Sequence, residues 1–360
     1  MKFIDLKAQQ KKIKIELDKR ISTVLDHGKY IMGPEVYELE ERLQSYTGSK
    51  YCITVSSGTD ALLISLMSLK IGPGDEVITT SSSFIAIIEV IVRLGAKRVL
   101  VDIDRSTCNI DASQIESKVT KNTKAIIPVS LYGQPSNMDE INAISTKYGS
   151  IPVIEDAAQS FGSTYKGKKS CNLSTIGCTS FFPSKPLGCY GDGGAIFTND
   201  SCIAQACKEI RIHGQSKRYI HSRIGVGGRM DTLQCAIVLA KLDNFNWEVQ
   251  QRRIIGNRYN KLVDDYGIKR VEQHVDCTSI FGQYSVFIKN RGKLQEKFKN
   301  IKIPLAIHYP LLLNEQPAYK DIFNSSGSFP VAKSASKEII SIPMHPYLTK
   351  SNQIKIIQSL

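Results

Sequence analysis

The amino-acid sequence predicts an α/β fold, with a mostly parallel sheet in a large domain and a smaller C-terminal α+β domain. Strand-like and helix-like runs alternate from about residue 50 to residue 214, which is typical of a parallel sheet covered by helices. The pattern changes after Phe245, and 360 residues exceed the roughly 250 to 300 that one core accommodates. We therefore expect a helical arm and the large domain in residues 1–245, and the small domain in residues 246–360.

Seven runs rich in β-branched residues predict the strands, and glycine, proline and polar turns separate them from amphipathic helices. The strands are expected within residues 51–56, 72–80, 97–103, 124–130, 151–156, 175–182 and 194–199. The intervening helices are expected within residues 58–70, 84–95, 137–149 and 200–214.

The two ends of the chain differ from this alternation. Two helices, within residues 15–31 and 36–48, are separated by the turn MGPE and predict an arm that packs on a partner or on the small domain. In the C-terminal part we expect a long polar helix over 247–267, a strand over 283–289, a helix over 291–300 and the loop 308–320.

Composition excludes several classes of protein. The net charge of +13 comes from 47 Lys and Arg spread along the chain among 34 Asp and Glu, without a basic run interleaved with aromatics, so nucleic-acid binding is not expected. No apolar run approaches the roughly 20 residues of a membrane span, and the opening lacks the apolar core of a signal peptide. Nine cysteines without a C-x-x-C pair predict reduced thiols in the cytoplasm, with neither disulfides nor a metal site.

Candidate ligand residues follow the ends of the predicted strands, where open α/β sheets bind ligands. In SSGTDAL a strand passes through Gly58 and Thr59 into a helix, an arrangement that binds phosphate but is also ordinary helix capping. In VIEDAAQS the strand ends at Asp156, with Gln159 just beyond, and Asp156 is either a ligand group or a helix N-cap.

The stretch SFFPSKPLGCYGDGG places a lysine, normally a surface residue, between two prolines beside a glycine cluster. Pro183 and Pro186 restrict the backbone on both sides of Lys185, which indicates a positioned amine. Ser180 is available to bind a phosphate, and the glycines from 188 to 194 allow close backbone approach.

A phosphate cradle, a strand-end Asp and a rigid lysine in an α/β domain are what pyridoxal phosphate requires. The lysine forms a Schiff base with the cofactor aldehyde, and the Asp keeps the pyridine nitrogen protonated. Phe84, at the start of a predicted helix, is available to lie against the ring, although a core position is an equal alternative.

Essentially the whole chain resembles the DegT-type nucleotide-sugar aminotransferases, a family that includes perosamine-synthetase-like enzymes. The resemblance rests on the joint order of motifs, any one of which is weak alone. They are FIDLKAQ, YIMGPEV, SSGTDAL, GPGDEVITT, PVSLYGQP, EDAAQ, SFFPSKPLG-x-x-GDGG, RIHG, GRMDTLQ, HYP with QPAY, and FP-x-A with SIPMHPYLT.

The resemblance implies the type I fold of aspartate aminotransferase and a homodimer with shared active sites. It implies that Lys185 carries the cofactor and that Asp156 pairs with the pyridinium nitrogen. The other implied cofactor contacts are Gly58, Thr59 and Ser180 to the phosphate, Gln159 to the ring hydroxyl and Phe84 on the ring; the implied substrate contacts are Arg229 of the second subunit, His308 and Tyr309. His308 could equally be a packed core histidine.

The implied reaction transfers an amino group from glutamate to a nucleotide-linked keto-sugar for O-antigen, lipopolysaccharide or another surface polysaccharide. A 4-keto-6-deoxyhexose is the favoured acceptor, and a UDP-linked 3-keto-uronate is the alternative. In the sugar dehydratases of the family the matching position looks like a histidine, so the resemblance with lysine at 185 favours transamination over dehydration. A non-catalytic regulator is the other alternative. One departure is Gly227, where relatives commonly carry an Asn that reaches the cofactor phosphate across the dimer.

Overall fold

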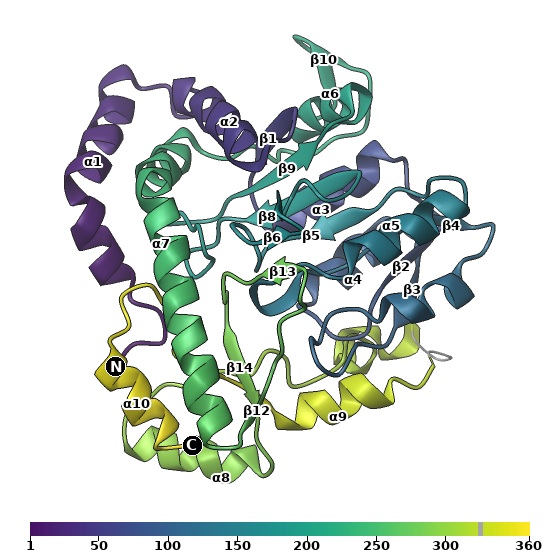
Figure 1. Cartoon of the computed structure of the whole chain (residues 1–360). Coiled ribbons are helices and arrows are strands. Elements are labelled where there is room, and N and C mark those ends of the chain that lie inside the picture. The colour runs from purple at the N-terminus through teal and green to yellow at the C-terminus, as the bar shows by residue number, and fades with distance from the viewer. Residues whose placement is uncertain (323–326) are drawn as a thin grey trace.

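The computed structural model describes residues 1–322 and 327–360, with only the backbone of 320–322. Seven strands form the central sheet in the order β3-β2-β4-β5-β8-β9-β1 (Figure 1). Isolated parallel bridges, such as Val129 with Asp156, join β4 to β5. In this order β9 runs opposite to the other six strands, which all point the same way. The strands are β1 Tyr51–Val55, β2 Glu76–Thr80, β3 Lys97–Val101, β4 Thr123–Ile127, β5 Ile154–Asp156, β8 Ile176–Ser180 and β9 Gly194–Thr198.

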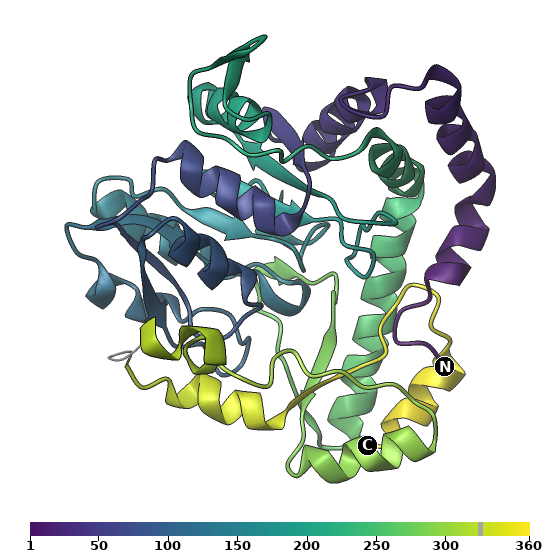
Figure 2. The ribbon, with the colours of Figure 1, turned by 180° about the vertical axis from the view of Figure 1, so that it is seen from behind.

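Helices cover both faces of this sheet because successive strand residues point to opposite sides. In β9, Ile196 packs into the cluster formed with α3, α4 and α6, whereas Ala195 and Phe197 pack into the cluster formed with α2 and α7. Seen from behind, α3 and α4 lie over the sheet (Figure 2). The helices are α2 Pro34–Thr47, α3 Gly58–Ser68, α4 Ala86–Arg93, α5 Met138–Lys147, α6 Ser201–Arg211 and α7 Thr232–Asp265.

The long helix α7 begins at Thr232, well before the expected start at 247. The stretch from Cys235 to Ala240, near its start, is apolar and buried on every side, so it lacks the one-sided pattern by which a surface helix is recognised. The helix continues unbroken through residue 245, where the sequence placed the boundary between the two domains. In Figure 1 it connects the sheet with the C-terminal part of the chain.

The C-terminal part has a hydrophobic cluster of its own, which includes Tyr259, Phe298 and Ile356. The C-terminal part also contacts the helices that cover the central sheet. The backbone N–H groups of Val331 and Ala332, at the start of α9, donate to the Asp102 carboxylate, and α9 packs on the core around α3 and α4. Its elements are β12 Lys269–Arg270, β13 Cys277–Thr278, β14 Tyr284–Phe287, α8 Arg291–Asn300, α9 Pro330–Glu338, β15 Ile339–Ile342 and α10 Lys350–Ile357.

The N-terminal arm is the helix α1, Leu6–His27, which packs along α7 and is joined to α2 by a short turn. Its first residues reach the C-terminal part, where the backbone N–H of Met344 donates to the Phe3 carbonyl at 3.3 Å. Short strands complete the chain: β6 Thr164–Tyr165, β7 Lys168–Lys169, β10 Gln215–Lys217 and β11 Ile220–His221.

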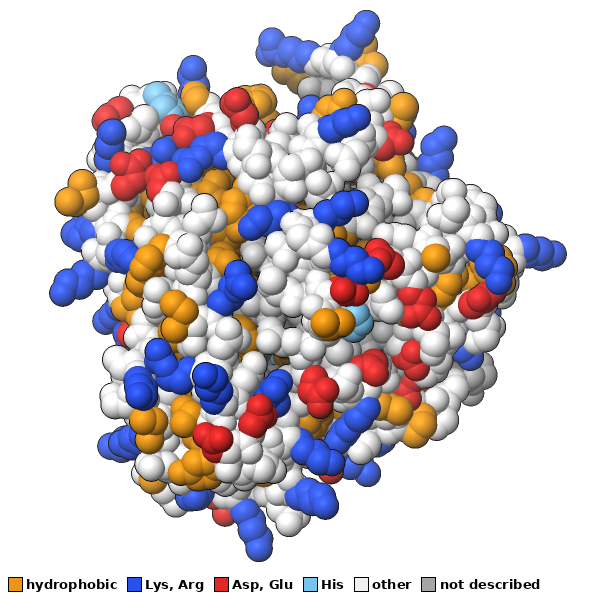
Figure 3. Space-filling model, viewed as in Figure 1, with side chains coloured by type: hydrophobic (Ala, Val, Ile, Leu, Met, Phe, Trp, Pro, Cys, Tyr) orange, Lys and Arg blue, Asp and Glu red, His pale blue; other side chains and the backbone are white. Residues whose placement is uncertain are grey.

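Lysine and arginine side chains are distributed over the face shown in Figure 3 and lie among acidic ones. The positive net charge is therefore not concentrated in one patch of that face. All nine cysteines are free thiols. Across the described residues, no helix has both the length and the apolar character that crossing a bilayer requires.

Candidate active site

A cavity of about 500 Å³ opens where β1, β5 and β8 end, at the carboxyl edge of the sheet. Ligands bind at this edge in open α/β sheets. Nine of the ten residues predicted from the sequence line this cavity, although they come from distant parts of the chain. They are Gly58, Thr59, Phe84, Asp156, Gln159, Ser180, Lys185, His308 and Tyr309.

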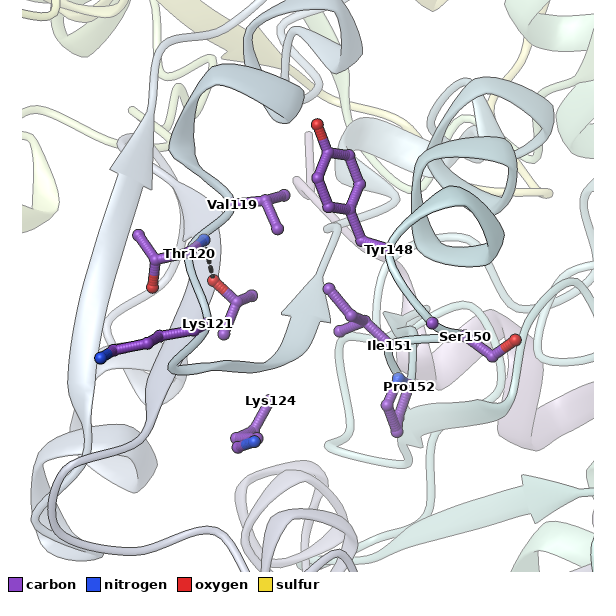
Figure 4. Close-up of a pocket in the computed structure, with 10 residues that line it drawn as sticks. Val119, Thr120, Lys121, Lys124, Tyr148, Ser150, Ile151 and Pro152 are labelled. Atoms are coloured by element: carbon purple, nitrogen blue, oxygen red, sulfur yellow. Dashed lines mark hydrogen bonds between the residues drawn. The ribbon is translucent and has the colours of Figure 1, made fainter.

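A second hollow, of about 460 Å³, lies at the opposite edge, where β4 and β5 begin (Figure 4). Lys121, Lys124 and Tyr148 are among its lining residues, and the Thr120 N–H donates to the Thr123 hydroxyl at 2.9 Å beside it. This lining consists of the loop before β4, the first residues of β4 and the connection that follows α5. The cavity at the carboxyl edge is the candidate active site, because it combines a carboxylate, an amine and a helix start.

The cradle predicted for a phosphate is the turn from β1 into α3. Ser57 caps the helix, because its hydroxyl accepts the Asp60 N–H at 3.0 Å, so Gly58 and Thr59 are not the capping residues. Gly58 lies directly against the end of β8: a Cβ added at Gly58 would stand 2.6 Å from the Ser180 Cβ. The close approach brings a helix N-terminus and two hydroxyl side chains to one end of the cavity, which suits an anion.

Asp156 is the last residue of β5, and its carboxylate accepts the Ala158 N–H at 3.1 Å. No helix begins there, so the bond closes a local turn and the N-cap alternative is wrong. Burial raises the pKa of the Asp156 carboxyl, while the Ala158 N–H and the Lys185 charge act in the opposite direction. A protonated ring nitrogen placed against this carboxylate would also act against the effect of burial and lower the pKa of Asp156.

Lys185 lies on a closed loop that follows β8. Its backbone N–H donates to the Phe182 carbonyl at 2.9 Å, and the Cys189 N–H donates to the Phe181 carbonyl at 2.7 Å across the base of the loop. A Cβ added at Gly188 would lie 2.6 Å from the Phe182 oxygen, so only glycine allows the two ends to meet. Burial lowers the pKa of the Lys185 amine, and Asp156 opposes that shift.

Gln159 connects two aromatic residues beside the cavity. Its side-chain oxygen accepts the Tyr132 backbone N–H at 2.9 Å, and its amide nitrogen donates to the Tyr309 hydroxyl at 3.2 Å. Gln159 is 3% exposed, so its position is fixed by these two bonds and by packing. Burial raises the pKa of Tyr309, which therefore remains a neutral hydroxyl.

Phe84 and His308 lie on the wall of the cavity and not in the core. Phe84 is 52% exposed, and its ring centroid is 5.9 Å from that of Tyr309. The His308 Nδ1 pairs with the Ser341 hydroxyl at 2.9 Å. Burial and the Lys185 charge lower the pKa of His308 to about 4, so the ring is neutral near pH 7 and is a hydrogen-bonding group without charge.

Arg229 is the one predicted residue outside the lining of this cavity in its own chain. Nearby, a Cβ added at Gly227 would lie 3.1 Å from the His213 ring and 3.7 Å from the Arg229 Nη2. An Asn at 227 would therefore require the His213 ring to shift by a few tenths of an ångström.

Several lining residues escaped prediction. Ser57 and Asp192 lie within the motifs SSGTDAL and SFFPSKPLGCYGDGG, so these motifs were a usable signal. Gln283 carried no local signal, because it comes from the connection between β13 and β14 in the C-terminal part. The remaining additional lining residues are Leu62, Ser83, Ala86, Val129, Ala158, Phe182 and Ser184.

The donor set fits pyridoxal phosphate. The cavity holds an amine for the aldehyde, a carboxylate for the ring nitrogen, an aromatic face and a helix start with hydroxyls for the phosphate. Gly58 supports the fit, because a side chain at this position would enter the space between the helix start and Ser180.

Gly194→Ala is expected to weaken cofactor binding at least tenfold and to cost about 1–3 kcal/mol of stability. Its Cβ would lie 2.6 Å from the Ser57 carbonyl carbon and 2.8 Å from the Gly58 nitrogen, so the cradle itself must shift. Gly292→Ala in α8 is the control, since a Cβ at this position would meet no described atom within 4 Å. Titration with cofactor and thermal unfolding measure both effects; equal affinities in the two variants would contradict the expectation.

Comparison with known proteins agrees with this site. The profile of the DegT/DnrJ/EryC1/StrS aminotransferase family matches residues 11–360. The chain is 53% identical over 357 residues to UDP-2-acetamido-2-deoxy-3-oxo-D-glucuronate aminotransferase of Pseudomonas aeruginosa, covering 99% of this chain and 98% of that protein. It is 37% identical to dTDP-3-amino-3,6-dideoxy-alpha-D-galactopyranose transaminase of Aneurinibacillus thermoaerophilus, covering 99% and 98%.

Solved structures agree in fold. A DegT DnrJ EryC1 StrS aminotransferase from Brucella abortus superposes with a TM-score of 0.95 at 40% identity, covering 100% of this chain and 98% of that one. The structure of ntda from Bacillus subtilis, with bound cofactor PMP, superposes with a TM-score of 0.89 at 28% identity, covering 99% and 82%. The predictions of an α/β aminotransferase fold, of an enzyme and of pyridoxal phosphate as cofactor are confirmed. The chain belongs to the DegT/DnrJ/EryC1/StrS aminotransferase family.

Proposed function

We propose that this enzyme transfers an amino group from glutamate to the C3 keto group of a UDP-linked uronate sugar. The observation that carries the proposal is the cavity that brings Lys185, Asp156 and the Gly58 turn together at one sheet edge. An amine, a carboxylate and an anion cradle in one enclosed space support transfer of an amino group.

The cofactor, when bound, supplies an aldehyde and an electron-withdrawing ring that hold the amino group between the two half-reactions. Lys185 supplies the proton transfers: its Nζ removes the Cα proton of glutamate and later delivers a proton to the sugar carbon that receives nitrogen. The lowered pKa of this amine favours the neutral form that a base requires. Overall, glutamate and keto-sugar become 2-oxoglutarate and amino-sugar.

Asp156 and Gln159 orient the ring in this proposal. Asp156 stabilises positive charge on the ring nitrogen from the end of a strand, where its backbone cannot move independently of the sheet. Gln159 donates to the Tyr309 hydroxyl at 3.2 Å, and in this proposal it would also bind the ring hydroxyl. Gly58, Thr59 and Ser180 would hold the phosphate, and Phe84 would cover the ring.

The choice of acceptor rests on the relatives. The relative at 53% identity is named for a 3-oxo-glucuronate, and the one at 37% for a 3-amino sugar, so both names place the nitrogen at C3. This moves our proposal from the 4-keto-6-deoxyhexose favoured by the sequence to the 3-keto-uronate alternative. Within the cavity, neutral His308 and Tyr309 would contact the sugar.

A homodimer completes the site in this proposal. Arg229 lies outside the lining of its own chain's cavity, and a second copy would bring an Arg229 guanidinium to the sugar carboxylate. The resemblance to perosamine-synthetase-like enzymes supports a role in surface polysaccharide biosynthesis, lipopolysaccharide O-antigen included, and the nine free cysteines support a cytoplasmic location.

Incubation of the purified enzyme with glutamate and a panel of UDP-, GDP- and dTDP-linked 3-keto and 4-keto sugars tests the proposal. We expect the mass change of amination with the UDP-linked 3-keto-uronate, and turnover of the same sugar lacking its carboxylate to fall about tenfold or more. Preferential turnover of a 4-keto-6-deoxyhexose would overturn the proposal that the acceptor is a 3-keto-uronate. A deoxysugar product would instead identify a dehydratase.

A further inference from the structure

Lys241 is a buried cation close to the candidate active site, and no step of the proposed reaction uses it. It lies in the first half of α7 and is only 3% exposed. A buried lysine is uncommon and needs partners that compensate for lost hydration. Its partners therefore indicate what the side chain does.

The partners of Lys241 belong to the segment that follows Lys185. Its Nζ donates to the Gly188 carbonyl at 2.5 Å and lies 4.1 Å from the centroid of the Tyr190 ring. Both contacts are ones that a cation makes well, a charge-assisted hydrogen bond and a cation–π contact.

A second side chain of α7 holds the same segment. Gln234 accepts the Tyr190 backbone N–H at 2.9 Å. Gln234 and Lys241 are two helical turns apart and therefore lie on one face of α7. The end of the Lys185 loop is thus attached to a rigid helix at two points.

Because the Lys185 loop is closed, its attachment to α7 also fixes the position of Lys185. Gly188 meets the backbone of Phe182 and Pro183 so closely that an added Cβ would stand 2.6 Å and 2.7 Å from their oxygens. The Cys189 N–H bond to Phe181 closes the base. A displacement of Gly188 therefore displaces the whole loop, with Lys185 at its middle.

We propose that Lys241 is a positioning residue for Lys185, which holds the Gly188 carbonyl and thereby sets where the Lys185 amine enters the cavity. The inference rests on the proposed role of Lys185 in carrying the cofactor. Burial lowers the pKa of Lys241 to about 8, and Glu248, two turns further along α7, opposes the shift. The Glu248 carboxylate also accepts hydrogen bonds from the Gln9 amide of the arm at 2.9 Å and from the Tyr347 hydroxyl at 2.8 Å. Polar contacts on α7 therefore extend from the Lys185 loop to the C-terminal part.

Lys241→Met tests the proposal, since it keeps the length of the side chain and removes the donor. In the loaded protein we expect about tenfold weaker cofactor binding and an altered visible circular dichroism band, which reports how the ring is held. Lys169→Met is the matched control: Lys169 also lies over a tyrosine, at 4.4 Å from the Tyr46 ring, but away from the loop. Its dichroism band and affinity should equal those of the wild type.

An unchanged band and affinity in Lys241→Met would overturn the proposal, as would equal changes in Lys169→Met. The thermal midpoint of the cofactor-free protein is measured alongside. If Lys241→Met fails to fold, Gln234→Leu releases the same segment at Tyr190, and the same two outcomes apply. Lys185→Ala is run in parallel: covalent attachment of cofactor in that variant would refute the proposed function itself, whichever way Lys241→Met behaves.

Discussion

Lys185→Ala is expected to abolish covalent attachment of the cofactor and to lower turnover by more than about 10⁴-fold. The variant loses both the nucleophile for the aldehyde and the base that moves the proton. The Lys185 side chain lines the cavity and is not part of the hydrophobic clusters, so the cofactor-free fold should be retained. The measurements are the visible absorbance of the loaded protein, its mass after borohydride reduction and unfolding, and the amination assay.

Lys185→Arg is the control for charge. Arginine keeps the positive charge beside Asp156, but its guanidinium remains protonated and cannot attack the aldehyde. Both variants should therefore lack the attached cofactor. Turnover near the wild-type rate in either one would show that another group carries the reaction.

The large sheet could be predicted because its strands have strong local signals. Glycine, proline and polar turns bound each β-branched run, and the structure mostly shortens the expected strands by one or a few residues. The run expected over 124–130 ends as β4 at Ile127, because Pro128 cannot donate the next ladder hydrogen bond. The start of α7 was missed for the opposite reason, since a helix that is buried all round has no amphipathic period.

The residues of the candidate site could be predicted where a polar or charged side chain lies at the end of a strand. Asp156 and Ser180 end their strands, and because β5 and β8 are parallel neighbours, both residues lie at the same edge of the sheet. His308 and Tyr309 depended on the resemblance, because no local pattern connects a loop of the C-terminal part with the sheet. Gln283 was missed on the same ground. Arg229 lies outside the lining of its own chain's cavity, so its contact with a sugar in a second copy stays a proposal.

Lys241 shows a further limit of the sequence. Its segment, KLDNF, reads as an ordinary charged stretch, and a lysine there is expected to be exposed. The side chain is buried only because the segment after Lys185 passes over α7 and offers it a carbonyl and a ring. Such a role depends on contacts between residues far apart in the chain, which no periodicity encodes.

Asp156→Asn is expected to lower turnover about 10²- to 10³-fold while cofactor remains attached to Lys185. The amide oxygen of asparagine can still accept the Ala158 N–H, so the turn after β5 is retained. What is lost is the negative charge that favours a protonated ring nitrogen. The visible absorbance of the attached cofactor should persist, and the rate of Cα deuterium exchange from labelled glutamate should fall with turnover.

The neighbouring Glu155 supplies a matched control on the same strand. It is fully buried, accepts the Ser130 and Ser170 hydroxyls at 2.8 and 2.7 Å, and lies outside the cavity lining. Glu155→Gln removes a more deeply buried carboxylate charge from the other face of β5, so it should lower the thermal midpoint and leave the exchange rate within about threefold. If the two variants lose the same amount of exchange activity, the loss reflects damage to the strand, and the charge of Asp156 has no special role at the ring.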